Sequence, residues 1–233
     1  MISLTAPGRK QPPAHYRTPV TSSIALAVVL LAVAWFALGL QWNLRKGNTL
    51  LRWLQGGLPL LGRRTTMRWL GSSVVELKIA QPTDPFLDAE VLVVLEPRDV
   101  GLLWGWGRLH GRRDFLILRA RLVQPPRFEV EAGDRRGWTG RDALQRLALA
   151  EWQRADWGDP DVQVAHSGGR APQVAHRLWQ EFQATSPAIW RLSIRRTHPH
   201  LEVHLRSPSP ERGSAERLFQ TFRELALAVT TNT

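Results

Sequence analysis

The chain has 233 residues and a formal net charge of +11, from 31 lysine and arginine residues against 20 acidic ones. It contains no cysteine, which excludes disulfide frameworks, thiolate metal sites and cysteine nucleophiles. Nine basic and no acidic residues fall within residues 1–75, so the other 22 basic and 20 acidic residues leave the rest of the chain at only +2. We therefore do not expect a nucleic-acid partner, and anionic lipid headgroups are the simpler counter-charge.

Residues 20–40, VTSSIALAVVLLAVAWFALGL, carry no charged side chain. A helix of this length is about 30 Å long, which matches the hydrocarbon core of a bilayer. Its eleven leucine, isoleucine, valine and phenylalanine residues each favour insertion by about 0.3 to 0.6 kcal/mol. The sequence therefore predicts one transmembrane helix at 20–40. Residues 1–19 mix prolines with basic and small residues, which predicts a disordered basic tail.

Two alternatives for the apolar run stay open. A cleaved signal peptide would need a small-residue site, and Ala32-Val33-Ala34 is the nearby candidate, although it lies inside the apolar run. A core helix of a soluble protein is the other alternative, but such a helix rarely extends twenty residues without a polar face. A retained membrane span is the favoured interpretation.

The distribution of basic residues predicts the orientation of that span. Three basic residues precede it and six follow it within residues 41–73, so the positive-inside rule places the C-terminal domain in the cytoplasm. The preference disappears when only the nearest twenty residues on each side are counted, and large domains can be translocated regardless of charge.

Residues 41–73 form a basic amphipathic juxtamembrane segment, in which two short amphipathic stretches fit at 48–55 and 63–70. Tryptophan rings favour headgroup depth, and arginines attract acidic lipid. The predicted membrane contacts are Arg45, Lys46, Arg52, Trp53, Arg63, Arg64, Arg68 and Trp69. The alternative is that the leucines of this segment pack beneath the soluble domain.

The pattern changes to short strands from residue 74, with strands expected at 74–80 and 89–96. A short helix could follow Pro97, in a stretch that carries Trp104 and Trp106. These two tryptophans cannot share one helix face, so a regular amphipathic helix does not explain both. The functional interpretation is a loop that enters the bilayer surface or contacts a membrane partner. A core-filling helix with one exposed tryptophan is the slightly favoured interpretation.

The remaining chain alternates strands and helices. Periodicity and capping signals predict strands at 114–123, 127–132, 162–165, 189–196 and 201–206, and helices at 140–153, 172–186 and 214–229. The expected fold is α+β, with mainly antiparallel strands and three or four helices in a soluble domain at 74–233. Because the order strand, helix, strand, strand, helix occurs twice, a duplicated βαββα unit with halves 74–155 and 156–233 is an alternative to one undivided domain.

One strand carries the best metal candidates, His200, Glu202 and His204, because residues two apart on a strand point to one side. The competing interpretation is the outer face of a strand whose Leu201, Val203 and Leu205 are buried. No nucleophile, base and orienting acid form a recognisable set, so no catalytic residue, resident metal or cofactor is predicted.

These features predict a single-pass membrane-anchored protein with a cytoplasm-facing α+β domain for binding or assembly. Its expected partners are the lipid bilayer with its anionic headgroups, and either another membrane protein or a second copy of the chain. The alternative is a membrane-tethered hydrolase or phosphate-ester enzyme that uses the His-rich strand or the loop at Ser167.

Overall fold

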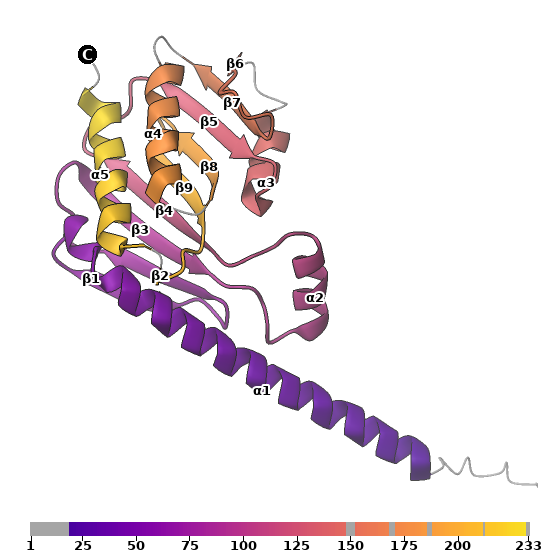
Figure 1. The fold of residues 1–233 in the computed structure, drawn as a ribbon. Helices are drawn as coiled ribbons and strands as arrows, with labels where there is room; N and C mark the ends of the chain where they lie inside the picture. Colours follow the sequence, from indigo (N-terminus) through magenta and orange to yellow (C-terminus); the bar gives the residue numbers. More distant parts are fainter. Residues whose placement is uncertain (1–18, 148–151, 168–170, 186–187, 212, 232–233) are drawn as a thin grey trace, which may run out of the picture.

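A computed structural model describes residues 19–147, 152–167, 171–185, 188–211 and 213–231. The predicted basic tail at 1–18 lies outside these residues. The first element is a single helix, α1 (Pro19–Gln55), which at about 1.5 Å per residue is roughly 55 Å long. Figure 1 shows its N-terminal half extending alone, away from the rest of the fold, whereas its C-terminal half lies against the domain.

The two halves of α1 differ in burial. All residues from 22 to 38 are exposed, whereas one stripe of the following turns is buried: Gly39, Asn43, Gly47, Leu50 and Leu54. This spacing of three to four residues is the period of an α-helix, so one face of α1 enters the domain. The helix ends at Gly56 and Gly57, and a short 3₁₀ turn, η1 (Leu58–Leu60), follows.

Nine strands form one antiparallel sheet in the order β1-β2-β3-β4-β9-β8-β5-β7-β6. The strands are β1 (Thr65–Trp69), β2 (Val74–Ile79), β3 (Phe86–Val94), β4 (Phe115–Leu122), β5 (Glu129–Asp134), β6 (Gln153–Ala155), β7 (Val162–Ser167), β8 (Ile189–Ile194) and β9 (Leu201–Arg206). The sheet and its helices confirm the predicted α+β class.

Four further helices surround the sheet: α2 (Gly101–Leu109), α3 (Trp138–Leu147), α4 (Ala171–Thr185) and α5 (Ala215–Thr231). Figure 1 shows α4 and α5 side by side over one face of the sheet, with α2 set apart near the middle of α1. The main core lies beneath α4 and α5, and Phe182, Phe219 and Phe222 are its largest fully buried side chains. On the opposite face, Phe115, Ile117 and Trp190 form a smaller cluster next to α3.

Three sequence-based expectations need correction. The stretch at 63–70 contains an edge strand, β1, which the sequence did not reveal because its exposed and half-buried residues do not alternate. The helix predicted at 140–153 does not reach its expected end, since Gln153–Ala155 pairs with β7 as a strand. The stretch at 48–55 is not a separate segment, because it continues α1.

The duplicated βαββα unit is also wrong. The first half contains β2 and β6 in addition, but β3 to α3 and β7 to α5 each follow the order strand, helix, strand, strand, helix. In the first of these two series, however, the first two strands, β3 and β4, are neighbours, whereas in the second the last two, β8 and β9, are neighbours. The strands of the halves also interleave, because β9 and β8 lie between β4 and β5. The domain is therefore one undivided sheet.

Candidate functional site

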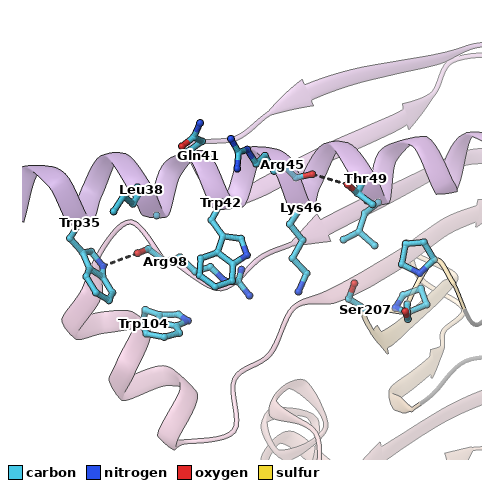
Figure 2. Close-up of a pocket in the computed structure, with 15 residues that line it drawn as sticks. Trp35, Leu38, Gln41, Trp42, Arg45, Lys46, Thr49, Arg98, Trp104 and Ser207 are labelled. Atoms are coloured by element: carbon cyan, nitrogen blue, oxygen red, sulfur yellow. Dashed lines mark hydrogen bonds between the residues drawn. The ribbon is translucent and has the colours of Figure 1, made fainter.

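A groove of about 830 Å³ lies between α1 and the domain. Its lining comes from α1, from Arg98 in the loop after β3, from Trp104 on α2 and from the segment 207–210 after β9. Figure 2 shows Trp35, Trp42 and Lys46 pointing from α1 toward Arg98 and Trp104. The groove therefore lies where the exposed half of α1 meets the domain.

A buried hydrogen-bond network fixes α1 along this groove. The Asn43 side chain donates from Nδ2 to the carbonyl oxygen of Glu96 at 3.0 Å, and its Oδ1 accepts from Arg98 Nη1 at 3.0 Å. Asn43 is fully buried, and both the N–H group and the oxygen of its side-chain amide make hydrogen bonds there. Gly39, one turn earlier, lies directly against the backbone of Arg98. This close approach explains why a residue without a side chain occupies that position.

Asp114 is the anionic centre of the same network. Its two carboxylate oxygens accept two hydrogen bonds from Arg98, at 3.0 and 2.9 Å, and it also forms an ion pair with Lys46 of α1. Burial alone would raise the pKa of Asp114, but hydrogen bonds and charge from Arg98 and Lys46 outweigh it and hold the pKa below its ordinary value. Two cations from different elements therefore share this carboxylate, and Arg98 also lies 3.6 Å from the Glu96 carboxylate.

Glu96 connects this network to α2. Its side chain, 3% exposed, accepts a 2.6 Å hydrogen bond from Trp104 Nε1 and two 3.2 Å hydrogen bonds from Arg108. The Arg108 guanidinium also lies 5.8 Å from the centre of the Trp104 ring. These contacts orient α2 relative to the sheet even though α2 does not lie on the sheet.

The outer surface of α2 is apolar and exposed. Leu102 is 92% exposed and Leu109 88%, with Leu103, Trp106 and Val100 about half exposed. Neither Trp104 nor Trp106 fills the core, so the core-filling alternative is wrong, although the segment is helical and one of its tryptophans is exposed. A cluster of this kind on a monomer is typical of a membrane or protein contact.

The position of α2 along α1 is set by Trp35. The Trp35 and Trp104 rings lie 6.0 Å apart, and the Trp35 side chain packs against the backbone of Gly101. Trp35 belongs to the apolar run and precedes its end at Leu40 by five residues, or about 8 Å along the axis. The apolar surface of α2 is therefore level with the last turns of the predicted span.

The predicted membrane contacts lie at different heights. Arg45 and Lys46 line the groove, about 8 to 9 Å beyond Leu40, but Arg52 and Trp53 lie roughly 18 to 20 Å beyond it along the axis. Trp53 donates to the carbonyl oxygen of Gly213. The others follow α1: Arg63 and Arg64 are exposed after η1, Arg68 pairs with Glu76, and Trp69 is half-buried beside Gly47.

Five leucines of the juxtamembrane segment lie inside the domain, whereas Leu44 and Leu70 are exposed. Leu50, Leu51, Leu54, Leu58 and Leu61 are all buried in the main core. For these side chains the alternative stated in the sequence analysis holds, because a bilayer cannot contact them. The membrane-contact hypothesis for this segment therefore depends on its basic residues and tryptophans, foremost on Arg45 and Lys46.

The His-rich strand, β9, takes part in an ionic network. Glu202 accepts hydrogen bonds from Arg191, Arg119 and His204. Burial would raise the pKa of Glu202, but the His204 hydrogen bond and the charges of His204, Arg191 and Arg119 hold it at about 2. His200 instead accepts from the backbone N–H of Leu122. Within the described residues, no three histidine or acidic side chains are placed to hold one metal ion.

Sequence reasoning missed Asn43, Glu96, Arg98 and Asp114. The stripe Gly39, Asn43, Gly47, Leu50 and Leu54 was the available signal, because its helical spacing continues past residue 40. No pattern in the sequence pairs Asn43 with residues more than fifty positions away.

The site as a whole can hold an amphiphile or a membrane surface, since it joins an exposed apolar helix, an apolar short helix and a cationic groove. Comparison with protein-family models found no match to this chain, and comparison with curated proteins found no relative.

Proposed function

We propose that the chain is a single-pass membrane-anchored protein whose α+β domain binds at the bilayer surface and serves in binding or assembly there. One observation carries this proposal: α1 is long and apolar enough to span a membrane, and the same helix continues into the domain core. A helix fixed at one end by Asn43 and Lys46 would hold the domain at a set height over the lipid. This continuity favours a structural anchor over a removable leader.

The surface of α2 supports a second point of contact with the bilayer. Interfacial helices bury their apolar face about 5 to 10 Å into the headgroup boundary. The Trp35 contacts place α2 about 8 Å inside the end of the apolar run, within that range. Arg112 and Arg113 follow the apolar residues and would meet anionic headgroups. Lipid is therefore the proposed counterpart of Leu102, Trp106 and Leu109.

Membrane retention tests the proposal. Membranes from cells that express the full chain are washed with alkaline carbonate, and the mass of the retained protein is measured. We expect the uncleaved chain in the pellet. Replacing both Leu30 and Leu31 by arginine should release it, because each charge costs about 2.5 to 3.5 kcal/mol near the centre of a span. Arginines at Gln153 and Gln220, on the domain surface, are the matched control and should leave retention unchanged.

Two results would contradict the proposal. One is a wild-type chain that stays in the supernatant without detergent. The other is a retained product that begins at Trp35, which would show cleavage after Ala34 and loss of most of the apolar run.

We also propose a cytoplasmic domain, since more basic residues follow the span than precede it. Protease added outside intact cells or spheroplasts should leave residues 76–233 intact and should digest them only after lysis. Digestion before lysis would reverse the orientation without affecting the anchor.

A further inference from the structure

The groove between α1 and the domain changes in character along its length. The end near the exposed half of α1 is lined by Trp35, Leu38, Gly39, Trp42 and Trp104. The other end is lined by Arg45, Lys46, Thr49, Ser207 and Ser209. Figure 2 shows Lys46 projecting into the space between α1 and the segment that carries Ser207. A phospholipid has the same division, an apolar tail and a polar head.

The charge of the groove favours an anion. Its lining contains three basic side chains, Arg45, Lys46 and Arg98, and no acidic one. Behind the lining, Asp114 pairs with Lys46 and Arg98, and Glu96 pairs with Arg98 and with Arg108 of α2. These two carboxylates offset two of the three positive charges of Lys46, Arg98 and Arg108. Arg45 adds a further positive charge at the solvent side, where its side chain is exposed. An anionic group at this end would therefore meet a local excess of positive charge.

The height of the charged end also matches a headgroup. Hydrocarbon occupies about 30 Å of a bilayer that is roughly 40 to 45 Å thick, so each headgroup layer is roughly 5 to 8 Å deep. The backbone of Arg45 and Lys46 follows Leu40 by about 8 to 9 Å along α1, at the outer edge of that layer, and side chains on an α-helix tilt toward its N-terminus, here back into the layer. Leu38 and Trp35 lie on the hydrocarbon side. The polar end of the groove is therefore near the height of the lipid headgroups of one leaflet, and its apolar end is at the height of the hydrocarbon of that leaflet.

We propose that the groove holds one anionic phospholipid from the adjacent leaflet, with its phosphate at Arg45 and Lys46 and its acyl chains running past Leu38 toward the bilayer. This inference rests on the proposed function, because a leaflet reaches the groove only if α1 spans the membrane. The volume of about 830 Å³ lies within the range of about 300 to 1,000 Å³ found for ligand sites. It accommodates the head end of the lipid, and the tails continue along the exposed half of α1.

Native mass spectrometry of the full chain in mild detergent tests this inference, with phosphatidylglycerol or phosphatidylcholine added as the probe. We expect one phosphatidylglycerol per chain to stay bound after other lipid is removed, and phosphatidylcholine to bind more weakly. Arg45→Gln should weaken phosphatidylglycerol binding roughly ten- to hundredfold, as expected for the loss of a charge-assisted hydrogen bond. Arg52→Gln makes the same charge change on the same helix outside the groove and should have little effect.

Several results would overturn the inference. If phosphatidylglycerol and phosphatidylcholine bind equally well, the charge of the headgroup does not contribute to binding. If Arg45→Gln and Arg52→Gln weaken phosphatidylglycerol binding equally, the groove is not the binding site. Displacement of the bound lipid by excess inorganic phosphate would show a site for the free anion. Each of these can occur with the chain fully retained in carbonate-washed membranes, so they are distinct from failure of the proposed function.

Discussion

The indole N–H of Trp35 donates a 3.0 Å hydrogen bond to the carbonyl oxygen of Arg98, 63 residues further along the chain. This bond joins the apolar run of α1 to the loop that leads into α2. Because Arg98 is also bound to Asn43 and Asp114, the loop is held at two heights along α1. The position of α2 relative to the membrane thus depends on a small number of contacts.

Trp35→Phe tests the first of these contacts. The substitution keeps an aromatic ring beside Trp104 but removes the only N–H of the side chain, which leaves the Arg98 carbonyl without this donor. A loss of about 1 kcal/mol corresponds to a roughly fivefold larger opening equilibrium constant for α2, and so to roughly fivefold faster amide exchange. Amide hydrogen exchange of residues 98–109 in detergent measures it. Phe36→Leu changes an exposed aromatic neighbour and is the control. Equal protection in wild type and Trp35→Phe would contradict the prediction.

Gly39→Ala tests the close approach of α1 to the domain. A Cβ atom at Gly39 would lie 2.3 Å from the carbonyl oxygen of Arg98, so backbone would have to move. We expect a loss of about 1 to 3 kcal/mol, which lowers the thermal unfolding midpoint in detergent. Gly105→Ala is the matched control, since nothing lies within 4 Å of a Cβ there. Because alanine favours helix, Gly105→Ala should not lower the midpoint. Equal midpoints for the two variants would refute the close contact.

Asp114→Asn removes the charge shared by Arg98 and Lys46. We expect a loss of about 3 to 5 kcal/mol at pH 7, because two cations lose their common anion and Arg98 is buried. The folded-state pKa of Asp114 is lowered, so its stabilisation is fully present above about pH 4 and is lost as the pH falls through the folded value. Thermal unfolding from pH 7 down to 3 should show this loss in wild type. If Asp114→Asn loses as much stability on acidification as the wild type does, the loss comes from other titrating groups.

Glu202→Gln tests the network on β9. Glu202 accepts hydrogen bonds from Arg191, Arg119 and His204, and its folded pKa of about 2 means that its stabilisation is lost as the pH falls from about 4.5 toward 2. We expect a loss of about 1 to 3 kcal/mol at pH 7. Glu76→Gln, which breaks the more exposed ion pair with Arg68, should cost less than about 1 kcal/mol. Similar thermal unfolding midpoints for the two variants would argue against a stabilising role for the Glu202 hydrogen bonds.

The sequence predicted elements where one local pattern decides the structure. The apolar run became the exposed half of α1, and strands such as β2 and β4 formed where apolar residues alternate or run together. Local patterns could not predict which strands pair, because β4 lies beside β9, and the paired residues are between 81 and 91 positions apart in the sequence. The same limit hid the groove: Asn43, Glu96 and Asp114 are separate polar residues until the fold brings α1 against the ends of β3 and β4.

The depth of α2 can be measured directly, because the chain has no cysteine and a single introduced one gives a unique label site. We propose Leu102→Cys and Leu109→Cys, each with a nitroxide label, in vesicles of phosphatidylcholine with phosphatidylglycerol. Both side chains are almost fully exposed on α2, whose Trp104 contacts Trp35, so we expect their labels to be more accessible to oxygen dissolved in lipid than to a water-soluble nickel complex. Gln153→Cys, on the edge strand β6 far from α1 in Figure 1, should show the opposite preference. If all three labels prefer the nickel complex, α2 lies in water, and its exposed leucines would have to contact another protein.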